Sequence, residues 1–356
     1  MIPFILLSLN ILVWSLLYIG FRRSIHNVQK GSSSTVPISV LVALKNEEAQ
    51  VPTLVEAFKK QIYPHFEVIF INDGSTDQTT AQLRLAIGDD LRFRLYDRPD
   101  DMRSGKKFAL TYGILQAKHA HLAFTDADCV PSPTWLRQLA GHITTIPDAV
   151  WVGYGPFLSE PTLLNLFVRY ETNLTAYLTA AFTGWGQAYM AVGRNLSYPK
   201  KTFEEVQGFA SHQHLLSGDD DLFIQTVQAH KTSPIYMVLE QEAWVYSSPP
   251  SSFRVWFRQK TRHFSAARGY ARRAMVGLSV IQMLQILSWA VLFWDFWTGL
   301  LALSLRWLFM ATCFSLVSVR LHTASLLLLI PLLDGLYHLM NLVVAPFGYL
   351  KKTLRW

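Results

Sequence analysis

The sequence predicts an α/β domain with a mostly parallel sheet and helices on both faces, flanked by α-helical transmembrane segments. The chain has 356 residues, of which 51% are hydrophobic, and the apolar residues gather at its two ends. Between the ends, short apolar runs rich in β-branched residues alternate with helical patterns, which favours a parallel sheet. The expected parts are an N-terminal membrane anchor over residues 1–21, a catalytic domain over 36–252, an amphipathic interfacial helix over 253–275 and a transmembrane region of about three segments over 276–350.

The first segment is expected to be an uncleaved anchor. Residues 1–21 carry no charged side chain over a length that spans a bilayer, and Arg22 and Arg23 follow directly. A cleaved signal peptide would place positive charge before the apolar run and end in small residues. The two arginines predict that the carboxyl side of this anchor faces the cytoplasm. Together with the apolar segments near the other end, the expectation is a multi-pass protein of the inner (plasma) membrane with a cytoplasmic catalytic domain.

The middle of the chain is expected to alternate strand and helix. The predicted strands are 38–44, 66–71, 93–96, 122–124 and 149–152, and the predicted helices are 51–62, 106–117 and 134–142. In such sheets ligands bind where the carboxyl ends of the strands meet the loops. Polar residues at those ends are therefore the candidates for a site.

Two carboxylates follow the strand at 122–124. Asp126 and Asp128 are one residue apart, and hard cations such as Mg²⁺ or Mn²⁺ bind one or two carboxylates and leave further positions to phosphate and water. A solvated turn also explains an isolated Asp-x-Asp. Asp126 and Asp128 therefore indicate a phosphate-bearing substrate only when they are taken together with the other charged residues at the predicted strand ends.

Two further strand or loop ends carry charged groups. Asp73 follows the second strand, and the small residues after it suit a turn and a helix cap, which leaves Asp73 itself unexplained. The loop that ends in Lys106 and Lys107 brings two ammonium groups to a helix start, where a diphosphate binds well. A solvated basic turn is the alternative for this loop.

Three consecutive aspartates precede the amphipathic run at 222–227. One of Asp219, Asp220 and Asp221 suffices to cap a helix. Adjacent carboxylates repel each other, which raises the proton affinity of at least one and suits a general base.

Six segments, taken in order, resemble the membrane-bound family 2 glycosyltransferases with the GT-A fold, the branch that includes ceramide glucosyltransferase and cellulose synthase. They are Val42–Glu48, Ile71–Asp77, Ser104–Leu110, Thr125–Asp128, Gly218–Leu222 and Gln259–His263. The resemblance implies a donor site made of Ala43, Glu47 and Asp73 at the base and ribose, Lys106 near the diphosphate, and Asp126 and Asp128 at the ribose, the phosphates and the metal.

The same resemblance implies that Asp219 is the catalytic base, with Asp220 as the second choice. Gln259 and Arg262 match the family's Gln-x-x-Arg motif, and Arg262 would neutralise the departing diphosphate. Two positions depart from the family pattern. Asn72 replaces a common Asp, and His263 replaces the usual Trp, which puts the acceptor-stacking role of that position in doubt.

The function implied is inverting, metal-dependent transfer of a single sugar from a nucleotide diphosphate sugar, a UDP-sugar foremost, to the hydroxyl group of a membrane lipid. The alternatives are a processive polysaccharide synthase, a polyprenyl-phosphate glycosyltransferase and a catalytically inactive membrane scaffold. A processive enzyme would need more spans and would be expected to keep the aromatic residue at position 263. The intact acids argue against the scaffold.

Residues 253–275 combine seven basic and several aromatic side chains with no acid and contribute much of the net charge of +7. Next to membrane spans, this composition predicts contact with an anionic membrane surface rather than with nucleic acid. An ordinary positively charged flank of a span is the alternative.

The C-terminal region predicts spans near 276–294, 300–319 and 323–350. Asp334 and His338 lie four residues apart on one helix face. They indicate either a polar path or head-group contact, or a satisfied pair between packed helices.

Overall fold

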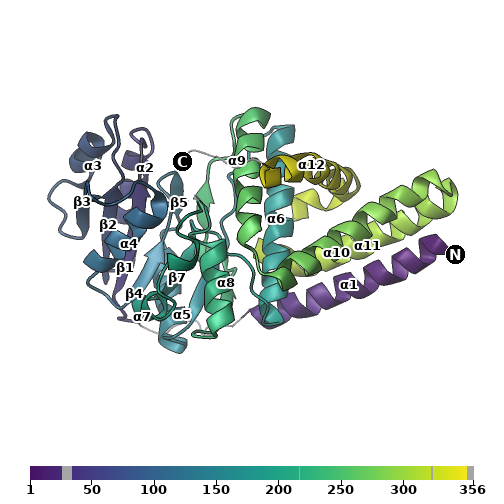
Figure 1. Cartoon of the computed structure of the whole chain (residues 1–356), viewed down its shortest axis with the longest axis horizontal. Helices are drawn as coiled ribbons and strands as arrows, with labels where there is room; N and C mark the ends of the chain where they lie inside the picture. Colours follow the sequence, from purple (N-terminus) through teal and green to yellow (C-terminus); the bar gives the residue numbers. More distant parts are fainter. Residues whose placement is uncertain (26–33, 216, 322–323, 351–356) are drawn as a thin grey trace. The chain divides into compact units, whose positions relative to one another are not determined.

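The computed structural model describes residues 1–25, 34–215, 217–321 and 324–350 and divides into two compact units (Figure 1). The sheet unit comprises the described residues of Ile25–Leu158 and Met190–Ser248. The helical unit comprises Met1–Ser24, Ser159–Tyr189 and the described residues from Pro249 onward. Each unit is described separately below.

The sheet unit is built on a seven-stranded sheet in the order β3-β2-β1-β4-β7-β6-β8. Its strands are β1 (Ile38–Leu44), β2 (Phe66–Asn72), β3 (Phe93–Asp97), β4 (His121–Phe124), β6 (Val150–Gly153), β7 (Leu196–Pro199) and β8 (Ile235–Val238). β1 pairs in parallel with β2 and β4, and β7 runs antiparallel to β4 and β6. The predicted α/β class with a mostly parallel sheet is confirmed.

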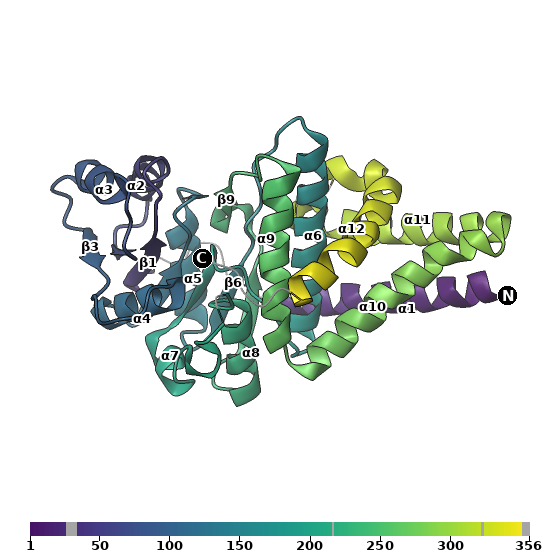
Figure 2. The same cartoon turned by 45° about the horizontal axis from the view of Figure 1, so that its top comes forward.

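Helices cover both faces of this sheet. They are α2 (Val51–Lys59), α3 (Thr79–Ile87), α4 (Lys106–Gln116), α5 (Trp135–Thr145), α7 (Lys200–Glu205) and α8 (Asp221–His230). Alternate residues of β1 and β2, such as Val40 and Phe70, share a buried core with α2 and α5, as a period of two requires. Figure 2 shows β1 and β3 between α2 and α3 on one side and α4 on the other.

Four short strands lie outside the predictions: β7, β8 and the two-stranded pair β5 (Cys129–Pro131) and β9 (Val245–Ser247). Each has only three or four residues, and β5 and β7 both end in proline. Such short segments show too little alternation to distinguish a strand from a loop. They form because their neighbours in the fold supply the pairing.

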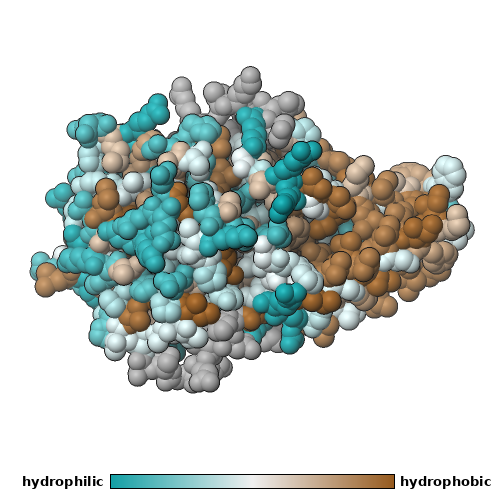
Figure 3. Space-filling model, turned by 60° about the horizontal axis from the view of Figure 1, so that its bottom comes forward, coloured by the Kyte–Doolittle hydropathy of each residue, from teal (hydrophilic) through white to brown (hydrophobic). Residues whose placement is uncertain are grey.

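The helical unit contains α1 (Ile2–Ser24), α6 (Leu163–Gly184), α9 (Phe253–Ala266), α10 (Arg272–Ala290), α11 (Phe296–Leu321) and α12 (Ile330–Leu350). Four segments of the described chain are long and apolar enough to cross a membrane, namely Ile2–Ser24, Arg272–Phe293, Phe296–Val317 and Ala324–Gly348. Apolar side chains dominate the surface of the helical unit in Figure 3. The expected apolar helix at residues 1–21 and three further apolar segments are therefore present, and their roles as anchor and membrane spans stay predictions.

Residues 253–275 do not form the single helix expected of them. α9 ends at Ala266, a short 3-10 turn follows, and Tyr270 has extended backbone angles. Arg272 and Arg273 then begin α10. The helical pattern of basic and aromatic residues continues through this break, and Gly269 is the only local signal that marks it.

A buried polar cluster joins α10, α11 and α12. Asp334 accepts hydrogen bonds from the guanidinium group of Arg306 and from the indole nitrogens of Trp289 (3.0 Å) and Trp307 (3.2 Å). His338 contacts the second carboxylate oxygen at 3.2 Å. Of the alternatives for Asp334 and His338, the satisfied pair between packed helices describes these contacts.

Candidate functional site

Most of the predicted donor and base residues of the sheet unit lie just after strands or at the starts of helices. Asp73 follows β2, and its main-chain N–H donates to the carbonyl oxygen of Leu44 at the end of β1 (2.8 Å). Asp126 and Asp128 follow β4, Lys106 begins α4, and Asp219 and Asp220 precede α8. The fold thus gathers side chains that lie more than a hundred residues apart in the sequence.

Lys106 forms ion pairs with two of the predicted functional acids. Its Nζ atom lies 2.7 Å from Oδ1 of Asp126 and 2.7 Å from Oδ2 of Asp219. Burial opposes the charge on Lys106, but the carboxylates of Asp126, Asp219 and Asp220 outweigh it and raise the pKa of the ammonium group well above its ordinary value. One protonated lysine therefore bridges a metal-side carboxylate and the proposed base.

Asp220 is the residue that caps α8. Its Oδ1 accepts from the main-chain N–H of Asp221 (2.7 Å), and its Oδ2 accepts from that of Gly193 (2.9 Å). Burial and the neighbouring charge of Asp219 raise the pKa of Asp220 to about 6. One of the three aspartates was expected to cap the helix, and Asp220 does so for α8. Asp219 contacts Lys106 instead.

Gly193 is a site residue whose contact with the carboxylates the sequence did not reveal. A Cβ atom at this position would lie 3.1 Å from Oδ2 of Asp220, 3.3 Å from Nζ of Lys106 and 3.4 Å from Oδ2 of Asp219. In the sequence, Gly193 stands three residues before the strand at 196–199, and a glycine at such a place also fits an ordinary turn. Its closeness to the acids depends on how β7 and α8 pack.

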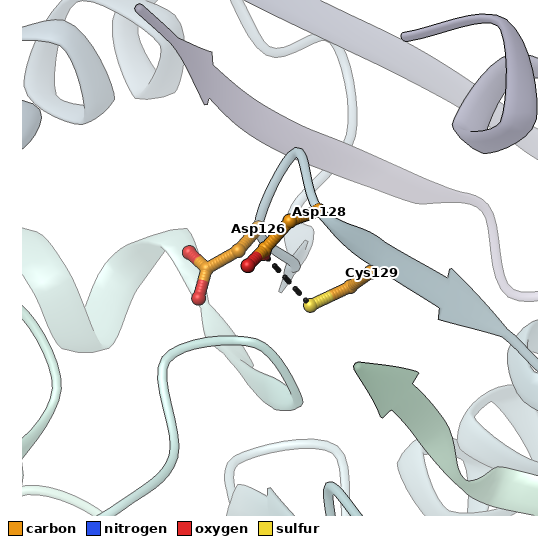
Figure 4. A group of neighbouring side chains, drawn as sticks. All are labelled: Asp126, Asp128 and Cys129. Carbon is orange, nitrogen blue, oxygen red and sulfur yellow. Dashed lines mark hydrogen bonds between the residues drawn. The ribbon is translucent and has the colours of Figure 1, made fainter. Parts of the chain in front are cut away.

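The residues after β4 fit a hard divalent cation. One ligand atom each of Asp126, Asp128 and Cys129 lies within 4.8 Å of the others (Figure 4). Cys129 is buried, and burial together with Asp126 and Asp128 raises the pKa of its thiol well above the ordinary value. Its sulfur contacts Oδ1 of Asp128 at 3.4 Å and the hydroxyl of Ser247 at 3.0 Å. The carboxylate oxygens remain as ligands, and Mg²⁺ and Mn²⁺ prefer oxygen.

Glu47 adds a third carboxylate to this neighbourhood. Burial, followed by the charges of Asp128, Asp126 and Asp77, raises the pKa of Glu47 to about 7. Glu47 therefore adds a partly buried acid whose charge repels those of Asp126 and Asp128.

The loop that carries Glu47 is fixed by the turn after β2. Asn46 adopts a positive φ of 57°, its main-chain N–H donates to Ser75 Oγ (3.0 Å), and its Oδ1 accepts from the N–H of Thr76 (2.8 Å). The N–H of Glu47 donates to Thr79 Oγ1 (2.7 Å). The small polar residues after Asp73 therefore hold this loop as well as the start of α3.

Asp73 organises the loop that leads to Lys106. Its side chain is buried and accepts from Arg98 Nε, from the hydroxyl of Ser104 (2.8 Å) and from the N–H of Gly105 (2.9 Å). Each carboxylate oxygen of Asp73 therefore accepts at least one hydrogen bond from this loop. A contact of Asp73 with the nucleotide base, as the resemblance implies, stays a prediction.

The departure at Asn72 has a structural reason. Its amide nitrogen donates to Oδ1 of Asp97 at the end of β3 (2.8 Å), and its amide oxygen accepts from the N–H of Ser75 (2.9 Å). An aspartate at position 72 would have no N–H to donate to Asp97, and the two carboxylates would repel each other. Asparagine satisfies both neighbours.

Gln259 and Arg262 lie on α9 of the helical unit, so their part in the site stays a prediction. α9 is held within that unit by Glu171 of α6, which accepts from Lys260 Nζ (2.9 Å) and from Trp256 Nε1 (3.1 Å). His263 is exposed. Ala43 lies on β1 opposite Ile71 of β2, and its contact with a nucleotide likewise stays a prediction.

A mostly parallel sheet with helices on both faces and acids at its strand ends is the architecture of the GT-A fold. Residues 39–207 match "Glycosyl transferase family 2", so this segment has the sequence pattern of a domain of that family.

Two curated relatives are similar in sequence. "Probable glycosyltransferase YdaM" of Bacillus subtilis is 24% identical over 254 residues, which cover 69% of this chain and 58% of the relative. "Glycosyltransferase AglE" of Haloferax volcanii is 32% identical over 194 residues, which cover 53% of this chain and 60% of the relative. The matched parts thus span about three-fifths of the length of these relatives.

One solved structure resembles the whole chain. It is a mannosyltransferase, PcManGT from Pyrobaculum calidifontis, in complex with GDP-Man and Mn²⁺, and it aligns with a TM-score of 0.55 over 96% of this chain and 98% of its own. The sequence identity is 16%. This similarity supports the fold.

Proposed function

We propose that the chain is an inverting, metal-dependent glycosyltransferase that moves one sugar, a hexose, from a nucleotide diphosphate sugar to the hydroxyl group of a membrane lipid. The observation that carries the proposal is the contact of Lys106 with both Asp126 and Asp219. It brings a metal-side carboxylate and a base within reach of one cation, as a displacement at the anomeric carbon requires.

The donor side of the reaction rests on charge. Asp126 and Asp128 would hold Mg²⁺ or Mn²⁺, which when bound neutralises negative charge that grows on the departing diphosphate. Lys106 adds a positive charge at the same place. A UDP-sugar is the first choice of donor, and the solved complex of PcManGT with GDP-Man and Mn²⁺ supports a nucleotide sugar and a metal in this fold.

The acceptor side rests on Asp219. In the proposed step its carboxylate accepts the proton of the acceptor hydroxyl, the hydroxyl oxygen attacks the anomeric carbon, and the bond from that carbon to the diphosphate breaks. Both oxygens of Asp220 accept main-chain hydrogen bonds, which favours Asp219 as the base and gives Asp220 an orienting role. One displacement inverts the anomeric configuration.

The acceptor is proposed to be a lipid because four apolar segments suit a membrane and α9 is basic and aromatic. The proposed location is the inner membrane with the sheet unit in the cytoplasm and α9 at the membrane surface. The small number of spans and His263 favour a single transfer over processive synthesis. Gln259 and Arg262 are proposed to act on the diphosphate.

The test is an assay of the purified protein with a set of UDP-sugars and GDP-sugars, Mn²⁺ and membrane lipid extract. A lipid that gains one sugar of inverted configuration, measured by mass spectrometry and by the anomeric NMR coupling, would support the proposal. A water-soluble polymer would show a processive synthase, and a sugar on a lipid phosphate would show the polyprenyl-phosphate reaction. Asp219→Asn serves as the inactive control.

A further inference from the structure

Lys107 differs from its neighbour Lys106 in what it contacts. Its side chain is buried, and Nζ donates to the main-chain carbonyl oxygens of His212 (2.6 Å) and Ser217 (3.1 Å). Consecutive helix residues point about 100° apart. In the first turn of α4, Lys106 therefore contacts the site carboxylates. Lys107 contacts the main chain at His212 and Ser217 instead.

Burial of the Lys107 ammonium group costs desolvation free energy unless its N–H donors form hydrogen bonds. Burial lowers the pKa of Lys107 to about 8, although the charges of Asp219 and Asp220 oppose that shift. An apolar residue would fill the same space in α4 without a desolvation cost. The ammonium group is therefore best explained by the two carbonyl groups that it holds.

The held segment leads directly to the proposed base. The described residues between Gln213 and Asp220 form no helix or strand, and Ser217 lies two residues before Asp219. Gly218, with φ of +97°, turns the chain there, and a Cβ atom at this position would lie 2.6 Å from the side chain of Leu222. Only glycine suits this backbone angle and this contact.

The carboxylate pair is thus anchored from both directions along the chain. Downstream, the main-chain N–H of Asp221 holds Asp220, and Gly193 holds it from a neighbouring loop. Upstream, Lys107 holds the carbonyl of Ser217. Loss of the upstream anchor would let the main chain before Asp219 move.

We propose that Lys107 is a positioning residue, which fixes Asp219 and Asp220 relative to Lys106 by holding the main chain at His212 and Ser217. This inference rests on the proposed function for its catalytic consequence. Its structural content, an ordered carboxylate segment, is independent of the reaction.

The test compares Lys107→Met with Lys201→Met. Methionine has nearly the length of lysine but no donor, and Lys201 is an exposed lysine on α7 of the same unit. Because a misplacement of about 1 Å can cost 10²-fold in rate, kcat of Lys107→Met should fall roughly 10- to 100-fold. The Kd for nucleotide should stay near the wild-type value, since Asp126, Asp128 and Lys106 are unchanged.

A positioning role also predicts a changed pH profile. The charged groups that face Asp220 are Asp219, Lys106 and, through its nearby charge, Lys107. Removing the charge of Lys107 should move the acidic limb of the kcat profile to higher pH. Lys107→Gln, which keeps an N–H donor, should recover part of kcat and serves as the second variant where methionine prevents folding.

Amide hydrogen exchange separates this inference from the proposed function. If the wild type transfers no sugar, the proposed function fails, but Lys107→Met should still speed exchange at residues 217–221 relative to Lys201→Met. Unchanged exchange in that segment would overturn the inference. In an active enzyme, a kcat and a pH profile equal to those of Lys201→Met would also overturn it.

Discussion

Two clusters of charged side chains, one in each unit, differ in exposure and in charge balance. In the helical unit, Asp334 has one cationic partner, Arg306, and further donors that fill its oxygens. In the sheet unit, Lys106 is shared between Asp126 and Asp219, and Asp128, Asp220 and Glu47 add further acids nearby.

The difference lies in charge balance. One acid matched by one base in an apolar environment is a structural device, and its loss leaves a charge without a partner. The acids of the sheet-unit cluster outnumber Lys106 and Lys107. The surplus negative charge is one that a metal ion or a proton would neutralise. Charge surplus, rather than burial, marks the site of chemistry in this chain.

The largest expected effect is on the rate in the sheet unit. Asp219→Asn should lower kcat by roughly 10²- to 10⁴-fold, because general base catalysis contributes that much, while nucleotide binding with metal is kept. The measurement is transfer rate together with nucleotide affinity. A fully active Asp219→Asn enzyme would show that Asp219 is not the base, and Asp220 would then be the next candidate.

The next effect is on the stability of the helical unit. Asp334→Asn should lower the free energy of unfolding by about 3–5 kcal/mol, because Arg306 stays buried without its carboxylate. The rate per folded molecule should be unchanged. The double variant Arg306→Met, Asp334→Leu is the control, and it should recover most of the stability, measured by denaturation in detergent. A single variant as stable as wild type would show that the cluster is not structural.

The pH dependence of the rate is expected to be smaller but diagnostic. The pKa of Asp220 is raised to about 6, so protonation of the acid pair begins at higher pH than for an ordinary aspartate. We expect kcat to fall as the pH decreases through about 6. Because a raised pKa favours the protonated form in the folded state, this group adds stability as the pH falls from about 6 toward 4. A rate that stays constant down to pH 5 would exclude the pair from proton transfer.

The smallest expected effect is that of Gly193→Ala. The new methyl group would lie 3.1–3.4 Å from Asp220, Lys106 and Asp219, and such crowding costs about 1–3 kcal/mol. We expect a several-fold or greater loss of kcat and no change in the helical unit. Equal rates for Gly193→Ala and wild type would mean that the cluster relaxes freely.

The sequence predicted those parts that depend on local pattern. β1 lies at its predicted residues because a continuous apolar run is enough to indicate a buried strand. The sequence also indicated four charged site residues, because acids and lysines near strand ends suit binding of a metal or a phosphate: Asp126, Asp128, Lys106 and Asp219. The contacts among them could not be read, since they depend on how distant segments pack.

Three further features show the same limit. β7 inserts antiparallel between β4 and β6, which no local signal specifies. Gly193 approaches the acids only because of that insertion. The partner of Asp334 was likewise open, because Arg306 lies 28 residues earlier on another helix.

The most direct test of the central claim is thermal stabilisation of the detergent-purified protein by UDP, GDP and CDP, each with Mn²⁺, with Mg²⁺ and with EDTA. Asp126→Asn, Asp128→Asn is the site-deficient control, and Asp334→Asn tests the other cluster. At a hundredfold excess over its Kd, a nucleotide that binds only the folded protein should add about 2.7 kcal/mol. We expect a metal-dependent shift with one nucleotide that is lost in Asp126→Asn, Asp128→Asn and kept in Asp334→Asn. No shift with any nucleotide, or a shift that persists without Asp126 and Asp128, would contradict the central claim.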